Sequence, residues 1–157
     1  MRRTRQELPK EETLEILKRN TSGVLALCGM DKKPYAVPLS YVYANQKLYF
    51  HVALEGYKLE LLNQNPNASF CVIDKDEILP EKFTTKYKSV IVQGKITVAD
   101  EHEKRNAITH LAKKYAPDMD PKDEIDRFWN QFLILVLEPA TCTGKQAIEL
   151  VKDGLQL

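Results

Sequence analysis

The chain has 157 residues, of which 43% are hydrophobic, and this is enough for one domain, residues 1–157, with its own core. Lysine and arginine total 23 against 22 acidic residues, and this balance argues against a dedicated nucleic-acid-binding protein. The longest unbroken apolar run, Phe132 to Leu137, is far too short for a helix that crosses a membrane.

The patterns predict ten elements in this chain order: a helix, three strands, a helix, two strands, two helices and a last strand. The predicted elements span residues 9–20, 22–30, 35–44, 47–53, 57–65, 68–74, 88–99, 104–116, 124–131 and 132–139. No internal repeat or linker interrupts them. The charged start "MRRTRQELPKEE" lacks the apolar core of a signal peptide, so we expect a cytoplasmic protein.

Several single residues sharpen these boundaries. Pro9 in the first turn favours a helix start. Pro38 cannot donate to a sheet, so it marks an edge, a bulge or a strand end, and Gly94 allows the fifth strand to bend. Asp100 and Glu103 form a D-x-x-E capping pattern before the long helix, which gathers its apolar residues on one face.

Six strands with hairpin-like connections predict a mainly antiparallel sheet with flanking helices, closing into a barrel. The third strand is apolar on both faces, with alternate residues Leu48, Phe50, Val52 and Tyr49, His51, Ala53. Because a small barrel has one dry interior, the second face needs a cover, either a helix or a second subunit. We therefore expect a homodimer.

The stretch "LYFHVALEGYKLELLNQNP" runs from a strand through a bend into a short helix. A helix start exposes unpaired N–H groups that bind anions, and Gly56 lets an anion approach the backbone. Lys58 in the first turn opposes the helix dipole, and a bound anion would remove that conflict. The bend is therefore a candidate phosphate site; an ordinary turn with a surface lysine is the alternative.

The segment "KYKSVIV" alternates Tyr87 and Ser89 with Lys86 and Lys88. Either pair would reach a phosphate if this strand lies beside the bend, and a solvated strand end is the alternative interpretation.

Together these segments resemble a known family. The ordered series "VPLSYVY", "LYFHVALEGYKLELL", "NPNASFCV", "KYKSVIVQGK" and "TGK" is similar to the FMN-binding split barrels, the superfamily of pyridoxamine phosphate oxidase. The "MRRTRQEL" start and the H-x-A-x-x-G-x-K-L core resemble the nitroimidazole-resistance (Nim) branch most. The resemblance covers nearly the whole chain and implies a six-stranded, homodimeric split barrel with FMN at the subunit interface.

The resemblance also implies which residues hold FMN. The backbone along the isoalloxazine edge would come from Val37, Pro38, Leu39 and Ser40. Beside the ribityl chain would lie His51, Val52 and Ala53. The phosphate would be held by Gly56, Tyr57 and Lys58, with help from Ser89. The partner subunit would contribute Trp129, Thr143 and Lys145.

Two departures from the family pattern bear on function. Val52 stands where Ser or Thr is common, and one lost hydrogen bond to a charged group costs roughly 1.5–3 kcal/mol. The C-terminal "TCTGKQAIELVKDGLQL" offers lysines and no arginine, so vitamin B6 oxidation is not expected.

The remaining titratable residues suggest little further chemistry. His51 is the one histidine in the implied site, where it would bond the flavin or act as the catalytic proton donor, or else be satisfied by the backbone. Trp129 is a core anchor or a flavin stacker. Scattered histidines and the separate Cys28, Cys71 and Cys142 predict neither a metal site nor a disulfide framework.

Three functions remain open. The first is an FMN-dependent oxidoreductase that takes electrons from NADH or NADPH and reduces a small, flat, electron-poor acceptor such as a nitroimidazole. The second is a non-catalytic FMN-binding protein that stores, senses or transfers electrons. The third is a haem-binding split barrel, for which His51 is the candidate axial ligand.

Overall fold

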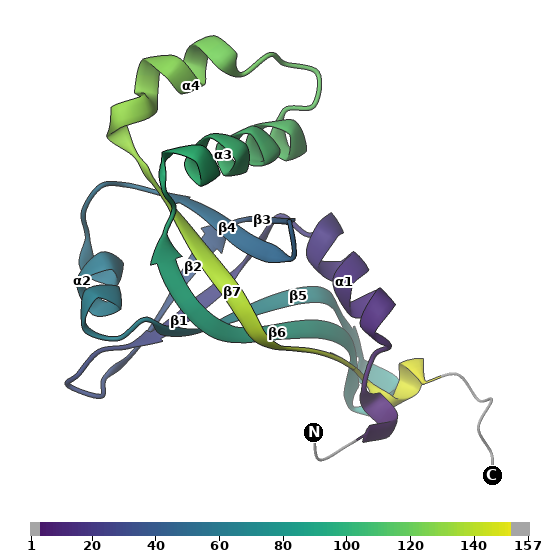
Figure 1. Ribbon diagram of the computed structural model, residues 1–157. Coiled ribbons are helices and arrows are strands. Elements are labelled where there is room, and N and C mark those ends of the chain that lie inside the picture. Colours follow the sequence, from purple (N-terminus) through teal and green to yellow (C-terminus); the bar gives the residue numbers. More distant parts are fainter. Residues whose placement is uncertain (1–3, 152–157) are drawn as a thin grey trace.

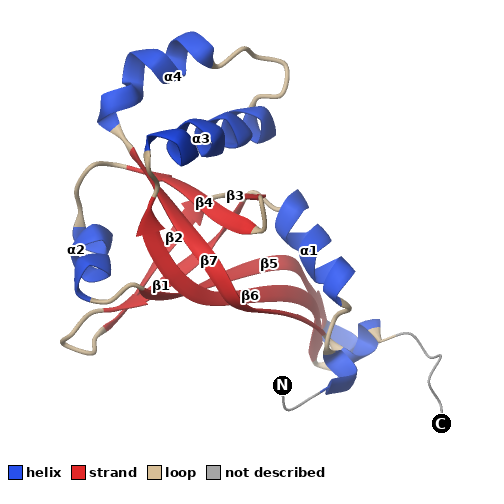
Figure 2. Cartoon of the chain, in the orientation of Figure 1, coloured by secondary structure: helices blue, strands red, loops and turns tan. Residues whose placement is uncertain are grey.

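Seven antiparallel strands form one curled sheet in the order β2-β1-β5-β6-β7-β4-β3 (Figures 1 and 2). The computed structural model describes residues 4–151, so Met1 to Arg3 of the "MRRTRQEL" motif and residues 152–157 lie outside the described residues. The strands are β1 (Ser22–Cys28), β2 (Pro34–Ser40), β3 (Val42–Ala44), β4 (Lys47–Val52), β5 (Asn67–Leu79), β6 (Thr84–Val98) and β7 (Leu133–Gln146). Because β2 and β3 are the two edges of the sheet, the barrel is split between them.

Within residues 4–151, four helices and four short 3-10 turns surround the sheet. The helices are α1 (Lys10–Arg19), α2 (Tyr57–Gln64), α3 (Glu101–Tyr115) and α4 (Lys122–Phe128), and the 3-10 turns are η1 (Thr4–Gln6), η2 (Pro80–Lys82), η3 (Trp129–Gln131) and η4 (Ile148–Leu150). The predicted cap is confirmed, because the Asp100 side chain accepts a 2.8 Å hydrogen bond from the Glu103 N–H. No helix within residues 4–151 is long and apolar enough to span a membrane.

The prediction of six strands was wrong by one, because the strand expected over residues 35–44 breaks at Tyr41. The Tyr41 hydroxyl donates to the Leu17 carbonyl at 2.8 Å, and its ring packs edge-on against Phe70 at 5.1 Å. Burial raises the pKa of Tyr41, so its hydroxyl stays protonated as a donor. Tyr41 is therefore buried in the barrel core at the point where the chain passes from β2 to β3. Pro38 lies in the edge strand β2, one of its predicted positions.

The last three strands are longer than the sequence predicted. β5 has 13 residues and β6 has 15, and they continue beyond the barrel as a two-stranded arm that turns at η2. β7 has 14 residues and continues past Pro139. It does so through a bulge, because Gln93 pairs with Thr141 whereas Gly94 pairs with Pro139. A Cβ at Gly94 would stand 1.9 Å from the Glu138 carbonyl oxygen, so glycine permits this close approach.

The hydrophobic core has two parts. Inside the barrel, buried side chains from α1 and most strands pack together, among them Leu17, Leu25, Phe50, Phe70 and Val92. A second cluster lies between the outer face of β4 and β7 and helix α3, and it contains Tyr49, Ala107, Leu111, Phe132, Ile134 and Val136. The alternation predicted for the third strand is confirmed at Leu48, Phe50 and Val52 on one face and Tyr49 on the other, whereas His51 and Ala53 are exposed.

The cover of the second apolar face is a helix of the same chain. Figure 2 shows α3 and α4 together over one end of the barrel, and Ala107 and Leu111 of α3 pack against Tyr49. The Tyr49 hydroxyl also donates to Glu103 at 3.2 Å. The apolar face of β4 around Tyr49 therefore needs no second subunit, which removes the sequence argument for a homodimer at this place.

Candidate functional site

The bend before α2 consists of Gly56 and the first residues of the helix, Tyr57 and Lys58. Gly56 is the residue before the helix, at φ 137°, a conformation that side chains rarely adopt. A Cβ there would meet nothing within 4 Å, so the space above the bend is open. Tyr57 and Lys58 begin the helix, and their N–H groups have no carbonyl four residues back within it. Among residues 4–151, no acidic side chain pairs with Lys58.

Helix α2 is fixed against the turn between β1 and β2. The Gln64 side chain accepts a 3.0 Å hydrogen bond from the Met30 N–H, and the Asn65 amide donates to the Cys28 carbonyl at 2.9 Å. At the start of the helix, the rings of Tyr57 and Tyr35 lie edge to face, with centroids 5.0 Å apart. The bend is thereby held beside the first residues of β2.

In the predicted flavin segment on β2, Val37 to Ser40, the side chains point alternately toward the barrel core and toward the outside. Val37 and Leu39 pack against the barrel core, whereas Pro38 and Ser40 are exposed on the other side. Ser40 and His51 line the same cavity. The structure therefore brings Ser40 and His51 together, and it places Tyr57 of the bend against Tyr35 at the start of β2.

Val52 lies differently from the neighbouring site residues. It is only 4% exposed, and its side chain packs in the barrel core. The side chain faces away from the open space that surrounds Ala53 and the bend, where residues are exposed. Valine at this position is a well-packed core residue. Because its side chain points into the core, a hydroxyl here would not face the proposed cofactor, and the expected loss of a hydrogen bond to FMN does not follow.

Ser89 and Lys145 lie apart from the bend. They pair with each other across β6 and β7, near the backbone bridge between Glu7 and Lys145. β7 stands between β4 and β6, so the "KYKSVIV" segment does not lie beside the bend as the phosphate interpretation required. Figure 1 shows α2 and the last residues of β7 at opposite ends of the barrel. Within one chain, these two residues and Lys58 do not converge.

Trp129 is engaged by its own chain. Its indole N–H donates to Glu101 at 2.8 Å, and the Arg105 guanidinium lies 4.0 Å above its ring. The ammonium of Lys104, which is 7% exposed, donates to the Trp129 carbonyl at 2.7 Å. These contacts anchor η3 to α3. Thr143 is exposed on β7, opposite Ile91 of β6.

His51 is placed beside two adjoining cavities beneath α3 and α4, of about 370 and 360 Å³. Both are lined by His51, Ile108, Glu124 and Ile125. Aromatic and aliphatic side chains form most of the walls, and Glu124 supplies a carboxylate. Sequence reasoning did not single out Glu124 or Ile125; the apolar face of the long helix, which includes Ile108, was the one signal toward this cavity.

The surroundings of His51 favour its neutral form. Partial burial lowers its pKa from the usual 6.5, and the positive charge of Lys104 lowers it further. The imidazole ring lies 4.7 Å from the Phe132 ring, and Lys104 stands 4.4 Å from the same ring. At neutral pH, His51 is therefore suited to bond a ligand as a neutral imidazole rather than to act as a charged acid.

Replacing Lys104 with methionine is expected to raise the pKa of His51 toward 6.5 without reaching it, because burial, the larger cause, remains. Titration of the imidazole ring signals by NMR measures this directly. His102→Gln is the matched control, since it removes a histidine from the exposed face of α3. A His51 pKa above 6.5 in the parent protein, or one unchanged in Lys104→Met, would contradict this electrostatic account.

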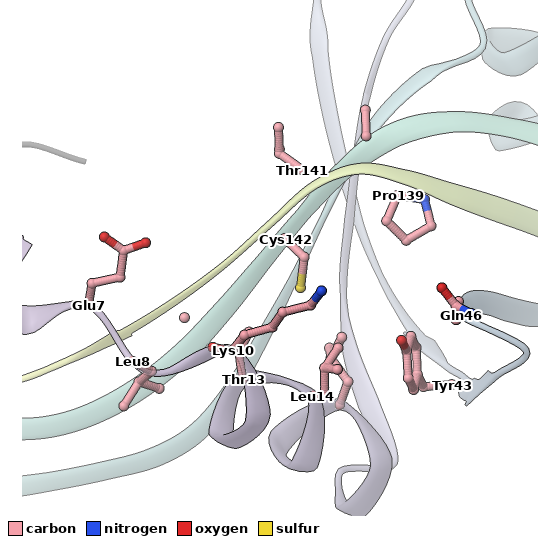
Figure 3. A pocket seen from close by; sticks show the side chains of 13 residues that line it. Glu7, Leu8, Lys10, Thr13, Leu14, Tyr43, Gln46, Pro139, Thr141 and Cys142 are labelled. Atoms are coloured by element: carbon pink, nitrogen blue, oxygen red, sulfur yellow. The ribbon is translucent and has the colours of Figure 1, made fainter.

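A larger cavity, of about 500 Å³, lies on another side of the barrel (Figure 3). It is bounded by α1, by the turn after β3 and by the bulged part of β7. Lys10, Tyr43 and Cys142 are among its lining residues. The sequence interpretation gave Lys10 no function and noted Cys142 only as a free thiol.

Comparison with known proteins gives three kinds of match. Residues 9–146 match the family described as pyridoxamine 5'-phosphate oxidase. An uncharacterised protein of Rhizobium meliloti (strain 1021) is 28% identical over 112 residues, which cover 68% of this chain and 69% of that protein.

Solved structures share the fold at lower identity. A proposed 5-nitroimidazole antibiotic resistance protein from Bacteroides thetaiotaomicron superposes with a TM-score of 0.76 at 23% identity, covering 89% of this chain and 86% of that one. An FAD- and haem-binding protein from Mycobacterium smegmatis superposes with a TM-score of 0.77 at 19% identity, covering 92% of this chain and 74% of that one. These likenesses show a common split-barrel architecture.

Proposed function

The chain belongs to the pyridoxamine 5'-phosphate oxidase family, and from this membership we propose that it binds FMN and reduces a small, electron-poor acceptor. NADH or NADPH is the proposed electron donor, and nitroimidazole-type compounds are the proposed acceptor class. The single observation that carries the proposal is the bend at Gly56 to Lys58. It combines an open space, free N–H groups and an unpaired lysine among the described residues.

The residues at this bend fit a phosphate group. The N–H groups at the start of α2 are donors with a favourable dipole, and the Lys58 ammonium adds a full charge. Val37 to Ser40 and His51 to Ala53 would border the rest of the cofactor; Ser40 and His51 line one cavity, and His51 to Ala53 precede the bend in the chain. FMN has one phosphate, which suits one bend with one lysine. The Mycobacterium smegmatis neighbour, named for FAD and haem, supports a flavin in this fold and makes FAD the alternative cofactor.

We propose further that the protein acts as a homodimer. An outward-facing row crosses five strands through paired residues, namely Pro38, Val24, Cys71, Ile91 and Thr143. Val24 is 40% exposed and Ile91 is 42% exposed, and nearby Ile73 is 61% exposed. A contiguous apolar face of this kind is typical of an interface. Because Pro38 belongs to this row, a second copy placed here would lie beside the proposed flavin site. It would also offer its own Ser89, Thr143 and Lys145 there.

A bound flavin would supply the redox chemistry, which no side chain provides. The protein would contribute the phosphate anchor, an apolar setting and hydrogen bonds. Neutral His51, at the boundary between the cofactor segment and the α3–α4 cavity, would bond the acceptor and is the proposed catalytic residue. The mostly apolar walls of this cavity suit a small, flat molecule, so we assign the acceptor to it.

Filling this cavity tests the assignment. Ile108→Trp is expected to raise the KM for a nitroimidazole such as metronidazole by about tenfold, since the larger side chain occupies acceptor space. FMN affinity should change less than this KM, because Ile108 lies outside the phosphate bend and meets the proposed flavin segments only at Ser40 and His51. Steady-state oxidation of NADH and NADPH in the presence of metronidazole gives the KM, and fluorescence titration gives the FMN affinity.

His102→Trp is the control for Ile108→Trp, because it places the same side chain on the exposed side of α3. A KM for metronidazole that is equal in the parent and in Ile108→Trp would show that the acceptor does not bind in this cavity. Tight FMN binding without turnover by either nicotinamide donor would favour the second candidate, a non-catalytic flavin protein.

Haem binding is the third candidate, and His51 is the observation that favours it. A neutral imidazole beside an apolar cavity is the form that ligates iron. Haem binding leaves the lysine and glycine bend without a role. The visible spectrum distinguishes the two, since haem gives a strong Soret band and flavin gives two broad bands.

A further inference from the structure

The large cavity beneath α1 arises from two features of β7. After Pro139 the bulge bends the strand, and further along Gly144 brings it into close contact with the helix. A Cβ at Gly144 would stand 2.3 Å from the Thr13 hydroxyl and 2.9 Å from Leu8. The strand therefore touches α1 at Gly144 and diverges from it toward the bulge. The cavity of about 500 Å³ lies in this gap. Its size is in the range of small-molecule sites.

The cavity has an apolar floor and a polar middle. The floor is formed by Leu8, Leu14 and Leu17 on the α1 side, and Leu17 is fully buried in the barrel core, whereas Pro139 lies across the cavity on β7. Figure 3 shows the side chains of Lys10, Cys142 and Tyr43 around the open middle, with Gln46 at one end. In addition to the larger effect of burial, Lys10 lowers the pKa of Cys142 and Cys142 raises the pKa of Tyr43, which agrees with the proximity of the three side chains in Figure 3.

These polar groups have no hydrogen-bond partner among the described residues. Within residues 4–151, the side chains of Lys10, Tyr43, Gln46 and Cys142 make no hydrogen bond or ion pair. Asn45 and Gln46 both have positive φ, 51° and 61°, as a two-residue turn of this type requires, and this turn sets Gln46 at the rim. Glu7 also lines the cavity, but Figure 3 shows it at the opposite edge, pointing away from Lys10.

The two titratable groups beside Lys10 in the middle of the cavity, Cys142 and Tyr43, are neutral. Burial raises the pKa of the Cys142 thiol, and Lys10 lowers it by a smaller amount, so the thiol stays neutral at neutral pH. Burial likewise raises the pKa of Tyr43, which remains an O–H donor. The middle of the cavity therefore presents an ammonium, a hydroxyl, a thiol and an amide N–H group, all of which donate hydrogen bonds.

We propose that this cavity is a second ligand site, separate from the flavin site, which binds a small monocarboxylate with an apolar tail. The carboxylate would accept hydrogen bonds from Lys10, Tyr43 and Gln46, and the tail would lie on the leucine floor. One lysine without an arginine matches one negative charge better than a phosphate. Figure 1 shows α1 and α2 on opposite sides of the barrel, so this site is distinct from the Gly56 bend.

Octanoate is the probe, and octanamide is its uncharged counterpart. Isothermal titration of the full-length protein is expected to show saturable, one-to-one binding of octanoate and much weaker binding of octanamide. Lys10→Met should weaken octanoate binding roughly tenfold or more, because it removes the charge and keeps an unbranched apolar chain. Lys18→Met is the matched control, because Lys18 lies on the same helix but does not line the cavity. Its ammonium pairs with the Glu15 carboxylate at a distance of 2.7 Å.

Alkylation of Cys142 by iodoacetamide, followed by peptide mass spectrometry, locates the probe. Octanoate should slow alkylation of Cys142 in the parent protein and in Lys18→Met, but not in Leu14→Trp, where the new side chain fills the cavity. Absence of saturable octanoate binding would overturn the proposal. So would octanoate affinity that is unchanged in both Lys10→Met and Leu14→Trp, because binding would then lie elsewhere. FMN binding does not enter either readout, so this test is independent of the flavin proposal.

Discussion

Gly56→Val is expected to abolish measurable FMN binding, and Lys58→Ala to weaken it by tenfold or more. Gly56 stands at φ 137°, and a β-branched residue held in so rare a conformation costs on the order of 1–3 kcal/mol. The bend would change shape and withdraw its N–H groups from the phosphate. Because a Cβ at Gly56 meets nothing within 4 Å, the variant should fold, and the loss would be specific to binding.

Lys58→Ala removes one charge-assisted hydrogen bond, which is worth roughly 1.5–3 kcal/mol, or about tenfold to a hundredfold in affinity. Quenching of flavin fluorescence on titration with protein gives the dissociation constants for FMN. Lys82→Ala, in the exposed turn at the end of the β5–β6 arm, is the control and should bind like the parent. FMN affinity that is equal in the parent, Gly56→Val and Lys58→Ala would show that the bend is not the phosphate site.

Ile91→Glu is expected to convert a dimer into monomers and to weaken FMN binding at the same time. Ile91 lies in the middle of the outward apolar row, between Cys71 and Thr143. An isolated carboxylate buried at an interface has a large desolvation penalty. In the single chain Ile91 is 42% exposed, so the substitution leaves the barrel core intact. Sedimentation velocity gives the mass of each variant, and circular dichroism checks the fold.

Met119→Glu is the control for Ile91→Glu, because Met119 is 71% exposed in the loop between α3 and α4 and lies outside the sheet. It should remain dimeric. A parent protein that sediments as a monomer of 18.0 kDa at micromolar concentration would contradict the dimer. Ile91→Glu that stays dimeric would place the interface on another face.

Local features of the fold were predictable from the sequence. The helix over α1 follows from Pro9 and the charges at its two ends, and the Asp100 cap from its D-x-x-E pattern. The strand around Tyr49 was predicted to have apolar residues on both faces, because apolar side chains occupy successive positions along it. In the site, the positive φ of Gly56 was foreseeable, since only glycine adopts it readily before a helix.

Features set by distant contacts were not predictable. The break at Tyr41 depends on a hydrogen bond to Leu17, 24 residues away. Helix α3 packs on the outer face of β4 and β7. This packing was not predictable because it depends on which strands are neighbours in the sheet. The expectation that the Ser89 segment lies beside the bend failed because β7 pairs between β4 and β6. The extension of β5 and β6 was not predicted because the arm is rich in polar residues. The α1 cavity was not predicted because it depends on the bulge after Pro139.

We propose that this split barrel holds a flavin at the Gly56–Lys58 bend. The decisive experiment is titration of the purified full-length protein with FMN, and separately with FAD, with the visible spectrum recorded throughout. We expect saturable, micromolar or tighter binding of FMN, one per chain, with weaker binding of FAD. Absence of saturable binding for both flavins would contradict it and would leave the ligand of the bend to be sought among other phosphate compounds.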